Sequence, residues 1–181
     1  MKKLAAAVVI FVLSAACSFA QEAAPYAGLQ KRRVKSLSEE KIRDYLGGSG
    51  MGLALPAELN RYPGPKHVLE LAEDLSLTDE QRAMSQLVFE KMDRDAKRLG
   101  KSIVEGEAAL DGLFETGTID EDQLATTLDG LAELEARLRY THLVAHLEMI
   151  EILSEEQVVR YTELRGYAEP SPSHQGHSMK H

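Results

Sequence analysis

Histidines carry most of the metal-binding chemistry that this sequence offers. His142 and His146 stand four residues apart in a stretch with helical apolar spacing. On a helix, this spacing places both imidazoles on one face, where two ring nitrogens can share a metal ion. His67 and Glu70 would supply further ligands if their helix packs nearby. The alternative is that His142 and His146 are partly buried core or interface residues with hydrogen-bond partners.

A second group of metal-binding side chains lies in the segment 168–181. This segment contains prolines and has no core-forming pattern, so we expect it to be disordered. Its histidines and its methionine suit a soft or borderline metal such as copper, nickel or zinc, and a merely solvated tail is the alternative. The candidate ligands are His174, His177, Met179 and His181.

The sequence does not indicate an enzyme. It has no Gly-x-Ser-x-Gly elbow, no His-Glu-x-x-His motif and no Glu-x-x-His pair of the di-iron bundles. The glycine-rich stretch 47–52 follows no expected strand, and no Lys-Ser/Thr follows its glycines, so it is interpreted as a flexible linker rather than a phosphate cradle. We therefore expect no enzymatic activity and no required cofactor.

The N-terminus has the three parts of a secretory signal peptide. Lys2 and Lys3 precede the apolar run 4–13, and small residues follow up to Ala20. The apolar run is too short for a stable membrane anchor. We expect cleavage after Ala20 and export of the mature chain. A lipoprotein modified at Cys17 is the rival interpretation.

The mature chain is strongly acidic. Without residues 1–20, 19 Lys and Arg residues remain against 29 Asp and Glu residues, a net charge of −10. Such a surface does not neutralise phosphates, so we expect no nucleic acid partner. The single cysteine leaves with the signal peptide, so we expect no disulfide.

Two copies of one short phrase open two of the expected helices. In each copy a Thr or Ser hydroxyl caps the first turn, and a Gln three residues later reaches back to the N–H of the capping residue, which forms a reciprocal capping box. Acidic residues behind each cap complement the helix dipole. The phrase residues are Leu77, Thr78 and Gln81 in the first copy and Leu153, Ser154 and Gln157 in the second.

Apolar spacing between the two copies predicts a long antiparallel helical hairpin. One helix runs from Asp79 to Gly117, on the order of 50 Å at 1.5 Å per residue. Asp120 and Gln123 form a third cap, which opens the return helix. Glycines at 100, 106 and 112 permit bending or the close approach of a partner helix.

Shorter helices are expected to flank the hairpin over 38–46, 67–75 and 154–166. The return helix is apolar nearly all round over 142–150, so the 67–75 helix or a second subunit should cover it. The fold class is all-α. The expected parts are a signal peptide at 1–20, a mobile arm with a short helix and the glycine-rich linker at 21–62, the hairpin domain at 63–167 and the tail at 168–181.

Together, the signal peptide, the helical hairpin and the paired Leu-Thr/Ser-x-x-Gln phrases resemble the Spy/CpxP group of periplasmic proteins, the LTxxQ-motif family. This group includes zinc-resistance-associated proteins and nickel/cobalt sensors. The resemblance implies a hairpin that dimerises into a curved cradle. In the metal sensors, N-terminal histidines join a Glu and a His-x-x-x-Met pair. Here His67 and the pair His142-x-x-x-His146 take those places, with Met149 one turn further along.

The expected function is that of a periplasmic, ATP-independent chaperone or envelope-stress modulator. A thin hairpin with a wide apolar stripe either dimerises or offers a patch to partners. The expected partners are a second copy of the chain and either unfolded periplasmic proteins or a membrane stress sensor. The alternative is a periplasmic sensor or resistance protein that binds zinc, nickel/cobalt or copper.

Overall fold

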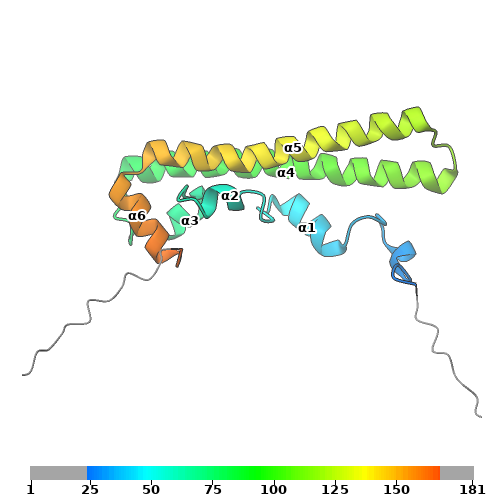
Figure 1. Ribbon diagram of the computed structural model, residues 1–181. Helices are drawn as coiled ribbons and strands as arrows, with labels where there is room; N and C mark the ends of the chain where they lie inside the picture. Colours follow the sequence, from blue (N-terminus) through cyan, green and yellow to red (C-terminus); the bar gives the residue numbers. More distant parts are fainter. Residues whose placement is uncertain (1–23, 168–181) are drawn as a thin grey trace, which may run out of the picture.

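The computed structural model describes residues 24–167, which form helices and loops without any strand (Figure 1). The expected all-α class is therefore confirmed. No helix in this range is long and apolar enough to cross a membrane. The expected signal peptide with Cys17, and the tail 168–181 with its candidate metal ligands, lie outside the described residues.

Two long helices form the frame of the protein. α4 spans Asp79–Thr116 and α5 spans Glu121–Ile152, and a short turn joins them. They lie side by side, as the apolar spacing predicted (Figure 1). At 1.5 Å per residue, the 38 residues of α4 span about 57 Å. We call α4 and α5 together the long helix pair.

All three predicted capping boxes are confirmed. Thr78 opens α4, Asp120 opens α5, and Ser154 opens α6, which spans Glu155–Leu164. In each box the capping side chain accepts a hydrogen bond from a backbone N–H of the first turn, and the Gln side chain accepts one from the N–H of the capping residue. Gly117 ends α4 with a φ of 64°, a conformation that glycine adopts without steric cost.

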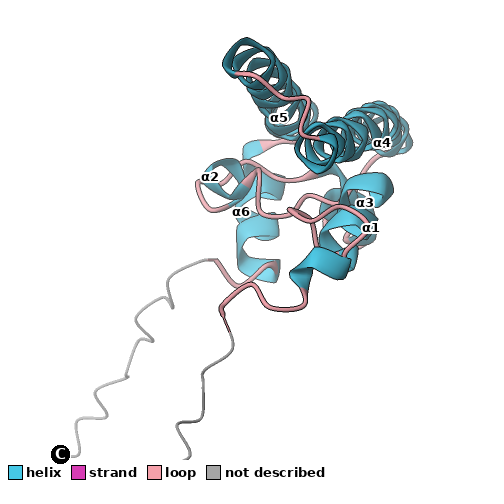
Figure 2. Cartoon of the chain, turned by 90° about the vertical axis from the view of Figure 1, so that its right-hand side faces the viewer, coloured by secondary structure: helices cyan, strands magenta, loops and turns pink. Residues whose placement is uncertain are grey.

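The remaining helices are short and lie on one side of the long helix pair (Figures 1 and 2). Figure 2 views the pair along its length and shows the short helices gathered beneath it, together with α6. The bounds of these elements are Leu29–Lys31 for the 3-10 helix η1, Glu39–Gly47 for α1, Leu55–Glu58 for α2 and Pro65–Glu70 for α3.

The helix predicted over 67–75 is shorter in the structure. α3 ends at Glu70, and turns follow up to Ser76. Ser76 has a positive φ of 51°, in the left-handed region, two residues before the α4 cap Thr78. Val68 and Leu75 are nevertheless both buried, so the apolar pattern predicted burial correctly but not helix length.

The described part of the expected mobile arm, 21–62, packs against α4. Val34 and Leu37 are both buried in the same core cluster as residues of α4. The basic run 31–33 dominates the sequence pattern in this region, and two apolar residues are too few to form a recognisable period. The packing of this segment was therefore missed.

Two α4 glycines allow close approach, as their positions suggested. A Cβ atom at Gly100 would collide with the carbonyl oxygen of Tyr45, at the end of α1. A Cβ at Gly106 would lie 2.8 Å from the Leu131 side chain of α5. A Cβ at Gly112 would meet nothing within 4 Å, so this glycine has no such role.

Two clusters of buried side chains hold the short elements on the long helix pair. The first lies between α1 and the long helix pair, and the second lies where α6 meets the end of α5. The first consists of Val34, Leu37, Ile42, Tyr45, Ala96, Leu99, Ile103, Val104 and Leu138. The second consists of Val68, Leu75, Met149, Leu153, Val158 and Tyr161.

Candidate functional site

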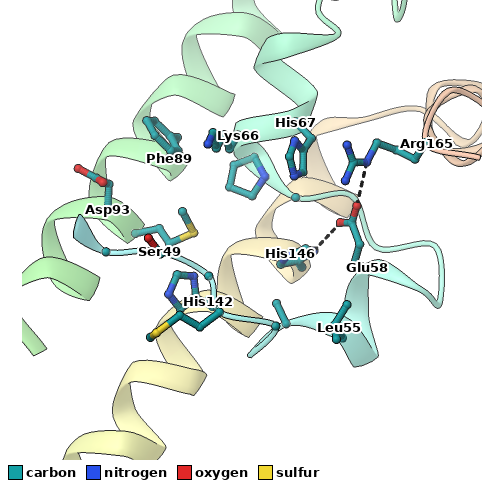
Figure 3. Close-up of a pocket in the computed structure, with 18 of the residues that line it drawn as sticks. Ser49, Leu55, Glu58, Lys66, His67, Phe89, Asp93, His142, His146 and Arg165 are labelled. Carbon is teal, nitrogen blue, oxygen red and sulfur yellow. Dashed lines mark hydrogen bonds and ion pairs between the residues drawn. The ribbon is translucent and has the colours of Figure 1, made fainter. Parts of the chain in front are cut away.

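A cavity of about 440 Å³ lies where the segment 47–67 crosses the long helix pair (Figure 3). α5 contributes His142 and His146 to its wall, and α4 contributes Phe89, Met92 and Asp93. The glycine-rich segment 47–52, interpreted from sequence as a linker, forms one side of the cavity. Gly48, with a φ of 67°, ends α1 and turns this segment toward the cavity.

His146 is a buried histidine with firm partners. It is 7% exposed, and its Nδ1 lies 2.7 Å from the carbonyl oxygen of Tyr62 and 3.8 Å from Oε2 of Glu58. Because a carbonyl oxygen only accepts hydrogen bonds, Nδ1 carries a proton and donates it to Tyr62. The backbone at Gly64 packs closely against the ring, since a Cβ there would lie 3.0 Å from Cε1 of His146.

Glu58 is the centre of a buried polar network beside His146. Its Oε1 accepts a hydrogen bond of 2.7 Å from the Tyr161 hydroxyl. The same atom accepts one of 3.2 Å from Nε of Arg165 (Figure 3). The backbone N–H of Gly64 donates to the same hydroxyl at 3.3 Å. Burial, and then the bond to Glu58, raise the pKa of Tyr161 well above its usual value. These partners stabilise a carboxylate that would be costly to bury alone.

His142 lies one turn earlier on α5 and differs from His146. It is 3% exposed, and its Nε2 is buried without a hydrogen-bond partner among the described residues. Burial, and to a smaller extent the neighbouring His146, lower its pKa, so the ring is neutral at physiological pH. A buried polar atom without a partner costs free energy, and such atoms are rare in folded proteins. The Nε2 atom of His142 is therefore the most unusual group in the cavity wall.

Of the other predicted metal ligands in the described chain, only His67 reaches the cavity. His67 lines the cavity, but its Nδ1 bonds Oε2 of the half-exposed Glu70 at 2.7 Å, and this bond lowers the pKa of Glu70. Glu70 is not part of the cavity wall. Met149 is fully buried in the second core cluster, among apolar side chains.

The cavity therefore brings His67, His142 and His146 together, but not Glu70 or Met149. Within residues 24–167, no group of three or more His, Cys, Asp or Glu side chains is placed to hold a metal ion. The burial of His142 and His146 agrees with the alternative that they are core residues. Only His146 also has the hydrogen-bond partner that the non-metal alternative requires.

Sequence reasoning missed several residues of the cavity and its surroundings. Glu58 and Arg165 are separated by more than a hundred positions, and no local pattern links them. Met51 was hidden in the glycine-rich stretch, although a methionine among glycines is a visible signal. Met92 lies in a stretch whose apolar spacing predicted only a long helix.

The two capping phrases have a structural role that involves each other. The Gln81 amide donates to Oε1 of Gln157 at 2.8 Å and to the Ile152 carbonyl at 2.9 Å. The Gln157 amide donates to Oε1 of Gln81 at 3.0 Å and to the Leu75 carbonyl at 3.2 Å. The two phrases thus fasten the start of α4 to the start of α6.

The two leucines of the phrases add apolar contact at this junction. Leu153 is buried in the second core cluster, and Leu77 packs against it. The residues of the two phrases therefore have structural roles, in capping, hydrogen bonding and apolar packing. No family model, curated protein or solved structure matches the chain, so function is inferred from its residues and their geometry.

Proposed function

We propose that this protein is a periplasmic, ATP-independent chaperone or envelope-stress modulator of the Spy/CpxP type, exported by residues 1–20 and acting as a homodimer. The observation that carries the proposal is an apolar surface on the long helix pair, on the side away from the short helices. The long helical hairpin and the paired Leu-Thr/Ser-x-x-Gln phrases support the same proposal by resemblance.

This surface, which we call the open face, consists of exposed apolar residues of α4 and α5. Leu87, Tyr140 and Leu147 are 67%, 68% and 55% exposed. At 100° per residue, Val144 points nearly opposite to both His142 and His146, which face the cavity, and Tyr140 points nearly opposite to His142. The short helices gather on a single side of the pair (Figure 2).

A groove of about 220 Å³ runs between the two helices on the open face. Val88, Tyr140 and Val144 line it, and an ion pair of 2.8 Å between Lys91 and Glu148 crosses it. Exposed apolar patches with charged rims are typical of protein-binding surfaces. An unfolding client would supply the apolar segments that cover this patch, and no bond chemistry is needed for such binding.

The test is suppression of aggregation of a thermally unfolding protein by the mature chain, without ATP and without metal. We expect suppression at near-stoichiometric ratios. The double variant Leu87→Glu and Tyr140→Glu should lose most of it, because two charges would interrupt the apolar patch. Leu59→Glu is the matched control, since Leu59 is 56% exposed but lies at the end of α2.

Two results would contradict the chaperone proposal. One is absence of suppression by the unaltered chain. The other is equal suppression by the open-face variant and by Leu59→Glu. Sedimentation equilibrium of the unaltered chain tests the proposed homodimer separately.

A second candidate function is metal binding, as in a periplasmic metal sensor or resistance protein. The observation that favours it is the buried Nε2 of His142, which lacks a protein partner one turn from His146. Calorimetric titration with zinc, nickel, cobalt and copper tests it on the mature chain. We expect sub-micromolar binding that His142→Ala and His146→Ala abolish. Binding that is weak, or that depends only on the histidines of 168–181, would contradict it.

A further inference from the structure

We propose that the cavity binds monovalent copper through Nε2 of His142 and the thioether sulfur atoms of Met51 and Met92. This inference rests on the second proposed function, metal binding, and names its ligand class. It replaces Glu70 and Met149, which the structure places outside the cavity, with two soft donors that line it.

Three separate segments supply these side chains to one cavity. Met51 comes from the glycine-rich segment, Met92 comes from α4 and His142 comes from α5. Figure 3 shows His142 projecting from α5 toward Ser49, two residues before Met51.

The donor set matches a soft ion. Two thioethers and one imidazole are neutral ligands, and thioether sulfur selects monovalent copper over the harder divalent ions. His142 is almost completely buried, and its Nε2 has no hydrogen-bond partner in the described chain. A bound ion would give this nitrogen a partner. Glu58 is not needed as a ligand, because Tyr161 and Arg165 already occupy it.

The backbone at Met51 provides a second, independent observation. Met51 has a φ of 45°, in the left-handed region that residues with a Cβ rarely occupy, and it stands between Gly50 and Gly52. Such strained conformations cluster at functional sites. At this position a glycine would adopt the same backbone without steric cost, whereas methionine adds a side chain that reaches both the cavity and the first core cluster.

The experiment measures copper(I) affinity under anaerobic, reducing conditions, by competition with a chromogenic copper(I) chelator. All variants carry alanine at His174, His177, Met179 and His181, so that the tail does not contribute. We expect one copper(I) ion per chain and sulfur scatterers in its X-ray absorption spectrum. Met51→Leu with Met92→Leu should weaken binding by more than about 100-fold, because even residues that only support ligands contribute about 10–100-fold.

The matched control is Met84→Leu. Met84 is 45% exposed on α4 and is not part of the cavity wall, so copper(I) binding should be unchanged. Circular dichroism is used to check that each leucine variant is folded. Leucine is close to methionine in volume, so the variants should fold normally.

The outcomes separate this inference from the proposed function. If the Met51 and Met92 variant binds copper(I) as tightly as the control, the copper(I) site is overturned. Zinc or nickel binding that depends on His142 and His146 would then still support metal binding. If the unaltered chain binds none of these metals, both proposals fail.

Discussion

The two ends of the long helix pair are built differently. The tip, residues 112–130, includes the turn between α4 and α5 and has no buried residue, and the structure describes all of it. The base is the opposite end, which includes the starts of α4 and α6 and the part of α5 that the short helices cover, residues 131–153 with the C-cap Leu153. The buried residues within 131–153 are Leu131, Leu138, His142, Ala145, His146, Met149 and Leu153.

Both ends begin with the same local signal, a capping box with Gln at its third helical position. At the tip, the Gln123 side chain accepts a hydrogen bond only from the backbone N–H of Asp120. At the base, Gln81 and Gln157 perform the same local task and also bond each other and two backbone carbonyls. The same local signal therefore contributes very differently to tertiary structure at the two ends.

The largest expected difference between the two regions concerns glycine. Gly100→Ala should lower the free energy of unfolding by about 1–3 kcal/mol or more, because the new Cβ collides with the Tyr45 carbonyl and displaces α1. Gly112→Ala, at the tip, should raise it by up to about 1 kcal/mol, since the site is open and alanine favours helix. Urea denaturation measures both changes. Equal changes of the same sign would refute the distinction between covered and open sites.

The next effect concerns the glutamines. Gln81→Ala should lower the free energy of unfolding by about 1–3 kcal/mol, because the Ile152 carbonyl loses its side-chain donor and Gln157 loses both of its bonds to Gln81 in a partly buried junction. The Gln157 amide keeps its bond to the Leu75 carbonyl. Gln123→Ala should lower the free energy of unfolding by only about 0.5–1 kcal/mol, since one exposed capping bond is lost. Thermal or urea unfolding of the two single variants distinguishes them. Equal losses would show that the paired amides add nothing beyond capping.

The smallest effect is a pH dependence confined to the base. The pKa of His142 is lowered in the folded state, mainly by burial, so protonation favours the unfolded state. Stability should therefore fall as the pH drops below about 6.5, the ordinary pKa of histidine, with a slope of at most about 1.4 kcal/mol per pH unit. It should level off below the folded-state pKa.

The control for the pH prediction is His142→Leu, whose free energy of unfolding should depend less on pH between 7.5 and 5.5. Urea titrations at several pH values give the difference between the two proteins. If the unaltered chain and the variant lose stability in parallel, other groups carry the pH dependence. The tip, 112–130, contains no histidine and should not contribute to this difference.

Much of the fold was predictable because its signals are local. The starts of α4, α5 and α6 follow from residues within four positions of each cap, and Gly117 marks the end of α4. Periodicity also placed His142 and His146 in a stretch with helical apolar spacing, and both are buried. What failed depends on distant contacts, as in the packing of Val34 and Leu37 against α4.

The candidate site was less predictable for the same reason. The spacing of His142 and His146 predicts a shared face, but not that Tyr62 bonds one ring and no described group bonds the other. The neighbourhood of Met51 and Met92 arises only when the glycine-rich segment folds across the long helix pair. Sequence patterns identify potential ligands, and tertiary contacts decide which of them meet.

The amide pair between Gln81 and Gln157 also has a kinetic consequence. Its partners are 76 positions apart, so forming the pair closes a long loop of chain. Contacts of such high sequence separation are costly to close early in folding. We expect substitution of either glutamine to speed unfolding while leaving the folding rate nearly unchanged, as for interactions that form after the transition state. The two phrases would then determine the lifetime of the folded state by slowing its unfolding.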